Sequence, residues 1–294
     1  MFEIQSHNQN SDQKVGQDSL SIRLKGKLFY FNKPKIMAIL NVNNDSFYAE
    51  SRANSETEIL FKIEKFVSEG ADFVDIGAQS TRPGATFIES KEEWNRLAHI
   101  LPLIRKEFPN VYLSLDTFHS EVANNGINEG MDVINDVSGG DFDSNMFGVI
   151  AQHQVPYLVM HTSGKPQIMQ SQTNYADVTQ VVLYNLSQKV LKLNTIGVND
   201  IMIDPGFGFG KTLNQNYELL QNLAVFKQLN CPILAGLSRK SMVNKVLNIQ
   251  ADQALNGSTV LHTLALMNGA NLLRVHDAKE AKEVVELVSY YQNI

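Results

Sequence analysis

Eight short apolar runs recur along the chain from Lys33 onward, and each is followed by a segment whose apolar residues have helical spacing. The first run covers residues 35–40, and the segment after it places Ile59, Ile63 and Phe66 on one helical face. Strands that alternate with helices pair in parallel through right-handed crossovers. The repeating part is about 260 residues long, close to the norm for a closed eight-stranded barrel. The pattern therefore predicts an α/β fold, a TIM-like (β/α)8 barrel.

An open doubly wound parallel sheet is the alternative fold that the same alternation allows. Sheets of that kind that bind dinucleotides carry G-x-G-x-x-G directly after the first strand. The sequence after residue 40 has no such motif, so the closed barrel is favoured.

The chain before the first barrel strand divides into two parts. Residues 1–18 are rich in Ser, Asn, Gln and Asp, which predicts a flexible polar tail. From residue 19 to 31, Leu20, Ile22 and Leu24 alternate with polar residues, and Gly26-Lys27 can turn the chain, so we expect a β-hairpin. We predict a single barrel domain over residues 19–294, with this hairpin at its N-terminal side.

Charge and cysteine content limit the partners. The 25 basic and 31 acidic side chains leave a net charge of −6, so there is no general attraction to nucleic acid or to an anionic membrane. Cys231 is the single cysteine, which excludes an intramolecular disulfide and suits a reducing compartment. We find no secretory signal and no apolar stretch long enough to span a bilayer. We expect a cytoplasmic protein without nucleic-acid or membrane partners.

Polar residues stand at the ends of the predicted strands, where the loops of such a barrel form its active site. Any one of them has a plain alternative role as a turn former, a helix cap or a solvated charge. Together they suit a flat polar heterocycle with an anionic arm, because carboxylates and amides bind N–H groups and cations bind phosphate or carboxylate. The residues in question are Asn41, Arg82, Asp116, Asn135, His161, Asp204, Lys240 and Arg274.

The run DPGFGFGK at residues 204–211 is dense in glycine, which permits close approach of the backbone. Its spacing differs from that of a P-loop. Two roles remain open for Phe207 and Phe209: both can be core residues, or one can pack on an aromatic ligand ring. We interpret His262, in a predicted helix away from any strand end, as structural.

Eight motifs occur in the order that is typical of one enzyme family, over about residue 33 to the C-terminus. The chain resembles the dihydropteroate synthases through the motifs ILNVNNDSF (39–47), DIGAQSTRPGA (75–85), SLDT (114–117), INDVSGG (134–140), MHTSGKPQIM (160–169), DPGFGFGKT (204–212), GLSRKS (236–241) and RVHD (274–277).

The resemblance implies a TIM-like barrel that is generally a homodimer. It implies a Mg²⁺-dependent transferase of folate biosynthesis that condenses 6-hydroxymethyl-7,8-dihydropterin pyrophosphate with p-aminobenzoate. The products are 7,8-dihydropteroate and pyrophosphate, and sulfonamides mimic the p-aminobenzoate. Two alternatives stay open: a related methyltransferase that uses methyltetrahydrofolate, and a non-catalytic pterin-binding paralogue.

The matching motifs also imply residue roles. The pterin would be bound by Asp116, Asn135, Asp204 and Lys240, with Met160 near its plane. The pyrophosphate would be held by Asn41, Arg274 and His276, with Asn41 also near Mg²⁺. The p-aminobenzoate would be held by Thr81, Arg82 and Pro83, by Phe209 against its ring, and by Ser241 at its carboxylate, where the N–H groups of a helix N-terminus attract anions. The residues implied to act in catalysis are Asn41, Arg82, Asp116, Lys240, Arg274 and His276.

The sequence departs from the family pattern mainly in the first loop. Asn43-Asn44 stands where Thr-Pro is usual, and Ala49 stands where an acidic residue is usual, with Glu50 beside it. Ala78-Gln79 also replaces Gly-Glu in the second loop. These changes bear on p-aminobenzoate handling more than on pterin binding, and the altered first loop is what supports the non-catalytic alternative.

Overall fold

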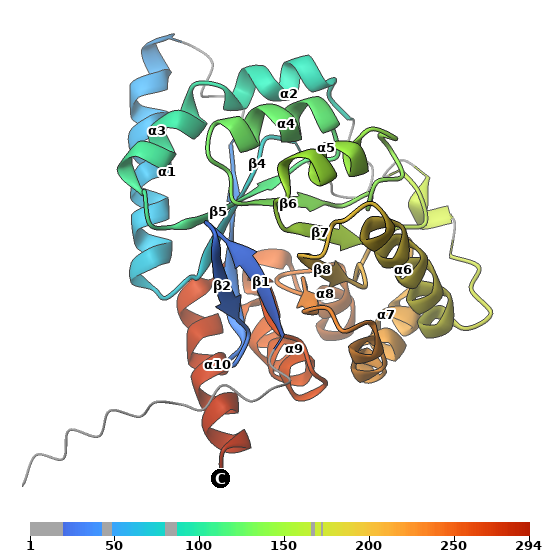
Figure 1. Cartoon of the computed structure of the whole chain (residues 1–294). Coiled ribbons are helices and arrows are strands. Elements are labelled where there is room, and N and C mark those ends of the chain that lie inside the picture. Colours follow the sequence, from blue (N-terminus) through green and yellow to red (C-terminus); the bar gives the residue numbers. More distant parts are fainter. Residues whose placement is uncertain (1–19, 43–48, 80–86, 166–167, 172) are drawn as a thin grey trace, which may run out of the picture.

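The computed structural model describes residues 20–42, 49–79, 87–165, 168–171 and 173–294 (Figure 1). Eight strands pair in parallel in the order β8-β7-β6-β5-β4-β3-β10-β9. An isolated bridge between Ile203 and Ile233 joins the two ends of this order, and the Ile203 N–H donates to the Pro232 carbonyl at 2.9 Å. The sheet therefore closes, and the predicted barrel is confirmed over the open alternative. The strands are β3 (Lys35–Asn41), β4 (Phe73–Gly77), β5 (Tyr112–Asp116), β6 (Val133–Asp136), β7 (Tyr157–Met160), β8 (Ile201–Asp204), β9 (Leu234–Ala235) and β10 (Leu272–Val275).

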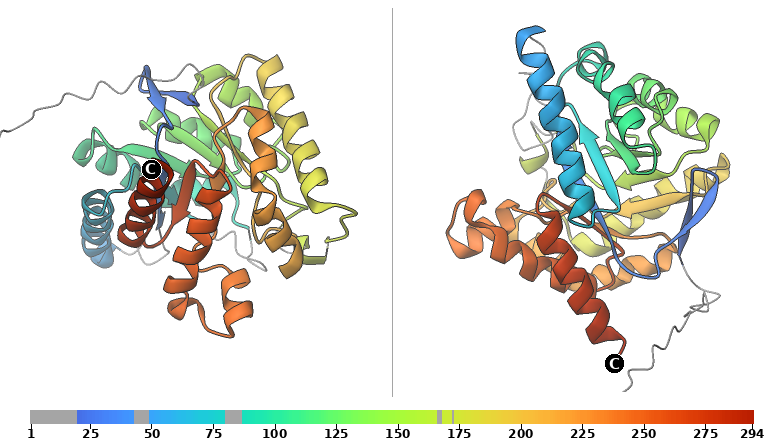
Figure 2. Two further views of the ribbon diagram at one scale, coloured as in Figure 1. Left: turned by 90° about the horizontal axis from the view of Figure 1, so that it is seen from below. Right: turned by 90° about the vertical axis from the view of Figure 1, so that its left-hand side faces the viewer.

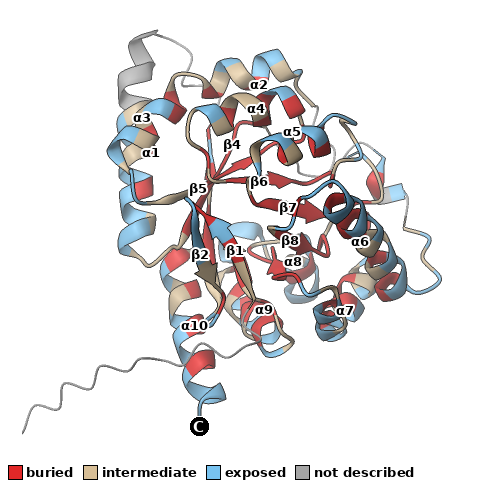
Figure 3. Ribbon diagram, in the orientation of Figure 1, coloured by how far each residue is buried: buried red, intermediate tan, exposed pale blue. Residues whose placement is uncertain are grey.

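Helices cover the outside of the barrel (Figures 1 and 2). The strands are buried along their length (Figure 3), as expected for parallel strands packed on both faces. Outward residues such as Ile36, Val74 and Leu113 belong to the core cluster beneath the helices. The helices are α1 (Ala49–Ser68), α2 (Ser90–Leu97), α3 (Ile100–Glu107), α4 (Ser120–Asn128), α5 (Met146–His153), α6 (Val178–Thr195), α7 (Leu213–Gln221), α8 (Ser241–Leu247), α9 (Leu255–Met267) and α10 (Ala278–Gln292).

The apolar residues Trp94, Leu97, Ala98, Leu101 and Ile104 have the spacing of one amphipathic helix, but the structure has two helices here, α2 and α3, which meet at Ala98 and His99. Pro102 explains the break, because proline lacks the N–H that would bond to the Ala98 carbonyl and its ring clashes with that carbonyl. The apolar residues Leu219, Leu220, Leu223 and Phe226 also suggest one helix from their spacing, but α7 ends at Gln221 and a 3-10 segment, Leu223–Leu229, follows.

The N-terminal hairpin consists of β1 (Ser21–Leu24) and β2 (Lys27–Tyr30). Its turn lies at Lys25-Gly26, one residue earlier than predicted, and both residues have positive φ (48° and 76°), as a type I′ hairpin turn requires. Ile22 and Leu24 are buried among inward-facing strand residues such as Met37 and Phe73. The hairpin thus closes the N-terminal end of the barrel. The predicted polar tail, residues 1–18, lies outside the described residues.

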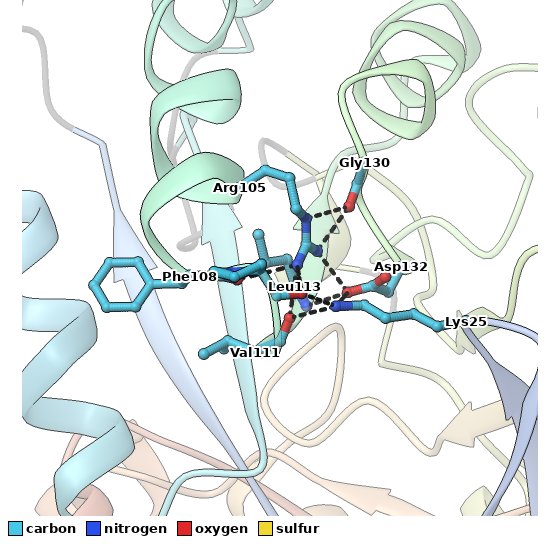
Figure 4. Close-up of polar contacts among 8 residues, drawn as sticks. Lys25, Arg105, Phe108, Val111, Leu113, Gly130 and Asp132 are labelled. Atoms are coloured by element: carbon cyan, nitrogen blue, oxygen red, sulfur yellow. Dashed lines mark hydrogen bonds and ion pairs between the residues drawn. The ribbon is translucent and has the colours of Figure 1, made fainter.

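A guanidinium-centred cluster ties the hairpin to the barrel (Figure 4). Arg105 of α3 donates to the Gly130 carbonyl at 2.7 Å, to the Val111 carbonyl at 2.9 Å and to the Asp132 carboxylate at 2.6 Å. Lys25, in the hairpin turn, lies 3.8 Å from the same carboxylate and donates to the Pro109 carbonyl at 2.7 Å. Arg105 therefore satisfies loop carbonyls that the end of α3 and the end of α4 leave without helical partners.

Replacement of Arg105 should destabilise the fold far more than replacement of Lys25. Arg105→Leu removes the donor to the Gly130 carbonyl and the nearest cation to the nearly buried Asp132 carboxylate, which keeps the Leu113 N–H and Lys25, so we expect a loss of about 3 kcal/mol in the free energy of unfolding. Lys25→Met removes a partly exposed contact and should cost less than about 1 kcal/mol. Urea denaturation of both variants measures the difference, and equal losses would show that Arg105 is not the centre of the cluster.

Candidate active site

The inward-facing side chains change from apolar to polar along the strands. The layer nearest the hairpin is apolar, with residues such as Met37, Leu158 and Leu272. The layers toward the carboxyl ends carry charged and amide groups from five strands, and these converge on the mouth of the barrel, as predicted. The buried or partly buried charged and amide residues that point inward are Asp75 (β4), Asp116 (β5), Asn135 (β6), Asp204 (β8) and Arg274 (β10).

Arg274 is the centre of this polar group. Its Nε lies 2.6 Å from Oδ2 of Asp75, and its Nη2 lies 2.6 Å from Oδ2 of Asp116. Asp75 also accepts a hydrogen bond from Nδ2 of Asn135 at 2.9 Å. One guanidinium therefore joins side chains of four strands.

Burial and ion pairing act in opposite directions on the pKa of Asp116 and on the pKa of Arg274. Burial raises the pKa of Asp116 to about 7, and the Arg274 guanidinium opposes that rise while the Asp75 carboxylate adds to it. Burial lowers the pKa of Arg274, but the carboxylates of Asp75 and Asp116 outweigh burial and hold it above its usual value. Arg274 is thus a fixed cation beside a carboxyl that can exchange a proton near neutral pH.

Asp75 is the main site residue that sequence reasoning missed. It is fully buried and takes part in two polar contacts of the pocket floor. The available signal was its position, since a carboxylate stands inside the apolar run FVDI of β4 at an inward-facing place. The register places it opposite Ser114 on the neighbouring strand.

Asp204 and Lys240 form the opposite wall. The Asp204 carboxylate accepts from the Gly206 N–H at 2.7 Å, and burial raises its pKa against the influence of Lys240. The Lys240 ammonium donates to the Phe207 carbonyl and lies 4.8 Å from the centroid of the Phe209 ring. Burial lowers the pKa of Lys240 to about 8, with Asp204 opposing that change.

The glycine-rich loop after β8 separates its two phenylalanines. Phe207 is fully buried in the core cluster, whereas Phe209 lines the pocket and belongs to the cluster around Met160. Gly206 has φ +74°, and a Cβ there would stand 1.9 Å from the His161 carbonyl oxygen, so only glycine fits. Phe207 is therefore a core residue, and Phe209 is placed where it could pack on an aromatic ligand ring.

Lys211 and His161 support this loop from beneath. The buried Lys211 ammonium donates to the Gly206 carbonyl at 2.8 Å and the Phe209 carbonyl at 3.1 Å, and it lies 3.0 Å from Nδ1 of His161. Burial lowers the pKa of Lys211 to about 7. Burial also lowers the pKa of His161 to about 2, so His161 is neutral and its Nδ1 accepts from the lysine. Lys211 is a further residue of this site whose role was not predicted from the sequence.

The pocket brings together most of the residues expected at the pterin. Its empty space, which includes the open mouth, is about 270 Å³. It offers carboxylates and an amide on one side and cations on the other, with apolar surfaces between them. Its lining residues are Asn135, Val137, Met160, Asp204, Phe209, Gly236, Lys240 and Arg274.

Other predicted residues lie outside that lining. Asn41 is exposed at the end of β3, and Ser241 is exposed at the first position of α8, beside a second hollow that Lys211 and Lys245 also line. His276 follows β10, with Nδ1 3.1 Å from the Ser238 hydroxyl. His262 is buried within α9, in agreement with a structural role.

Part of the predicted site belongs to segments outside the described residues. Thr81, Arg82 and Pro83 lie outside the described residues, and so do Asn43 and Asn44 of the first loop. Ala49 and Glu50 begin α1, but their side chains are outside the described part of the structure. Within the described ranges, no three His, Cys, Asp or Glu side chains gather as a metal group. No helix in those ranges is long and apolar enough to cross a membrane.

Comparison with known proteins gives consistent matches. The family described as "Pterin binding enzyme" matches residues 37–276. A dihydropteroate synthase of Haemophilus influenzae is 37% identical over 269 residues, which cover 89% of this chain and 97% of that protein. The Yersinia pestis dihydropteroate synthase, solved with a sulfonamide drug complex, superposes with a TM-score of 0.87 at 33% identity, covering 93% of this chain and all of that one. The Xanthomonas albilineans enzyme with 4-aminobenzoic acid has a TM-score of 0.85 at 32% identity, covering 94% and 99%.

A closed barrel with a buried carboxylate, amide and lysine pocket at its mouth, matched over most of its length, defines a pterin-binding enzyme. Within that class the chain belongs to the dihydropteroate synthase family, the transferases of folate biosynthesis.

Removal of the Arg274 guanidinium should lower the free energy of unfolding by an amount that depends on pH. Arg274→Met leaves Asp75 and Asp116 without the cation that bonds to both, so we expect a loss of about 3–5 kcal/mol in unfolding free energy at pH 8. At pH 5.5 the loss should be smaller, because protonation of Asp116, whose pKa is about 7, removes the charge that Arg274 compensates.

The control is Arg239→Met, which breaks an arginine–aspartate pair with Asp277 away from the pocket floor. Denaturation of both variants at pH 5.5 and pH 8 provides the comparison, and the Arg239 variant should show no such difference. An Arg274→Met penalty that is equal at the two pH values would contradict the pairing described here.

Proposed function

We propose that the chain joins 6-hydroxymethyl-7,8-dihydropterin pyrophosphate to p-aminobenzoate, releasing 7,8-dihydropteroate and pyrophosphate. The observation that carries the proposal is the set of buried groups at the barrel mouth, which matches the edge of a pterin. Asp116, Asn135 and Asp204 would accept from ring N–H and amino groups, and Lys240 would donate to the ring oxygen or nitrogen. Met160, on the pocket wall, would pack along the ring plane.

The same residues suit departure of the pyrophosphate before full bonding to the amine. Cleavage of the methylene C–O bond leaves positive charge on the pterin, and buried carboxylates close to the ring stabilise it. Asp75 and Asp116 are outside the pocket lining but bond to Arg274, which belongs to it. That Arg274 also holds the pyrophosphate, together with His276, stays a prediction, because two of its nitrogens already bond to carboxylates.

Mg²⁺ fits this site as an ion bound mainly through the substrate. Among the described residues the predicted protein ligand is one amide, that of the exposed Asn41, and Mg²⁺ commonly keeps several waters and binds substrate phosphates. Bound there, it would neutralise charge on the leaving pyrophosphate. His276 would share that role by donating to a phosphate oxygen.

The second substrate would enter between the glycine-rich loop and α8. Phe209 would pack on the p-aminobenzoate ring, and Ser241 with the first N–H groups of α8 would receive its carboxylate. The residues Thr81, Arg82 and Pro83 are proposed to complete this side. The amine nitrogen then forms a bond to the methylene carbon and loses a proton. Positioning matters more than a strong base, because an arylamine is already nucleophilic.

The two alternatives make different predictions for substrates. A methyltransferase would use methyltetrahydrofolate, and nothing in the described pocket favours it over the synthase. A non-catalytic paralogue would bind the pterin without releasing pyrophosphate. The cytoplasmic location and the absence of nucleic-acid partners remain proposals that rest on the single cysteine and the net charge of −6.

Purified protein with both substrates and Mg²⁺ should form dihydropteroate and pyrophosphate in equal amounts. EDTA should slow the reaction, and Lys240→Met should lower kcat/KM at least about 100-fold through loss of a buried charged hydrogen bond to the pterin. Sulfonamides should compete with p-aminobenzoate.

The two products, dihydropteroate and pyrophosphate, are measured separately by chromatography. Pyrophosphate without dihydropteroate would show that the arylamine site fails, and pterin binding without either product would favour the paralogue.

We propose a homodimer formed through an exposed apolar face on the last helices. α9 and α10 pack side by side (Figure 1), and α8 contacts α9. The positions 260, 264 and 267 have helical spacing on α9, so their side chains form a stripe. A self-complementary apolar patch of this kind suits a two-fold interface. The exposed residues of this face are Val246, Leu247, Val260, Leu264, Met267 and Leu287.

A charge placed in that face should separate the dimer. Leu264→Glu is expected to give a monomer by size-exclusion chromatography with light scattering, since an interface core tolerates an unpaired carboxylate poorly. Tyr184→Glu, on an exposed position of α6, is the matched control and should leave the mass unchanged. A dimer that persists in Leu264→Glu would place the interface elsewhere.

A further inference from the structure

Glu93 is a fully buried glutamate on α2, behind the polar group of the pocket. Burial raises the pKa of Glu93 to about 8, with Asp116 adding to the rise and hydrogen bonds from Thr117 and Gln79 opposing it. A carboxyl in such a place is costly compared with an apolar side chain. The proposed reaction gives Glu93 no contact with either substrate, so its burial needs another explanation.

The contacts of Glu93 reach two different strand ends. Its Oε2 accepts from the Thr117 hydroxyl at 3.0 Å and from Nε2 of Gln79 at 3.2 Å. Thr117 directly follows Asp116 at the end of β5, and Gln79 stands two residues after the end of β4. A single carboxylate oxygen therefore links the segments that follow two neighbouring strands, β4 and β5.

Hydrogen bonds from Arg96 and His119 hold the same two segments in place. Arg96, one turn along α2, donates to the Ala78 carbonyl at 3.0 Å. His119 donates its backbone N–H to the Thr117 hydroxyl oxygen at 3.2 Å, and its Nε2 lies 3.0 Å from the Ile88 carbonyl oxygen. The Thr117 hydroxyl thus receives one hydrogen bond and donates another, which fixes its orientation.

We infer that Glu93 is a positioning residue that fixes two sides of the active site at once, the Asp116 side through Thr117 and the side after β4 through Gln79. The inference rests on the proposed function, because its readouts are the two substrates. Thr117 is covalently next to Asp116, which is proposed to bind the pterin. Gln79 leads along the chain toward the residues proposed to bind p-aminobenzoate.

The charged groups around Glu93 agree with a hydrogen-bonding role. Asp116 faces it from β5, Arg96 lies on its own helix, and Nε2 of His119 is 3.9 Å from its Oε2. The carboxyl beside Asp116 is best tolerated in its neutral form, and a neutral carboxyl still accepts from two donors. Glutamine has the same shape and the same acceptor, so it can replace Glu93 in this role.

The test compares one conservative and one apolar replacement. Glu93→Gln keeps the acceptor and should stay within threefold of wild type in kcat/KM for both substrates. Glu93→Leu removes the acceptor and should raise both KM values at least tenfold, with a smaller change in kcat. Glu89→Leu is the control, because Glu89 is exposed at the start of α2 and its side chain makes no capping hydrogen bond. It should behave as wild type.

Two further variants separate the two arms of Glu93. Thr117→Val should raise mainly the KM for the pterin pyrophosphate, and Gln79→Met mainly the KM for p-aminobenzoate. Adding Thr117→Val to Glu93→Leu should not raise the pterin KM further, because both changes break one contact. Thermal melts accompany each assay. If Glu93→Leu does not fold, the two single-arm variants still test the inference through this split.

Three results would overturn the inference: folded Glu93→Leu with both KM values within twofold of wild type, Glu93→Gln as impaired as Glu93→Leu, or single-arm variants that affect the same KM equally. A wild-type protein that forms no dihydropteroate would instead refute the proposed function. An active wild type with an insensitive Glu93→Leu variant would refute only the positioning role, so the two failures are distinguishable.

Discussion

The pairing of one partly buried guanidinium, that of Arg274, with two buried carboxylates is the interaction on which the rest of the site depends. Asp75 and Asp116 stand on the inward faces of neighbouring strands, opposite Ser114 and Gly77 respectively, and Arg274 bonds to both carboxylates. Their pairing holds three strand ends in one arrangement. Burial raises the pKa of Asp116 to about 7 against the opposing effect of Arg274, so this carboxyl can change its protonation state while the cation stays in place.

The barrel supports this polar group by dividing its interior into two halves. Near the hairpin the inward side chains are apolar and packed, and Ile22 and Leu24 complete them. Toward the carboxyl ends the inward side chains are polar and lie under loops. The apolar half supplies burial that offsets the cost of ordering the chain, whereas the polar half accepts a desolvation penalty for the sake of recognition. A closed barrel can hold an apolar half and a polar half, because every second residue of each strand points into the same interior at a different height.

Sequence patterns predicted the barrel and most of the pocket because both depend on local periodicity. Strand–helix alternation and the residue that ends each strand are visible without tertiary contacts, which is why Asp116, Asn135, Asp204 and Lys240 were found. Asp75 was missed because its role depends on which strand face points inward, and its neighbours Val74 and Ile76 present an apolar run. Glu93 and Lys211 are likewise recognised only by their burial. The break between α2 and α3 was signalled by Pro102, but the apolar spacing continues across it.

The shortest strand also determines how the ring of strands is closed. β9 has two residues, and a single bridge, at Ile233, joins its side of the barrel to β8. Every other pair of neighbouring strands in the described barrel is joined by at least two residue pairs, so this junction is the most weakly paired place in the ring of strands. Asp204 ends the strand on one side of the junction, and Lys240 follows the strand on the other. A ligand that bonds to both Asp204 and Lys240 would link the two sides of this junction. Its binding would therefore stabilise the closed barrel, and any opening of the junction would weaken its binding.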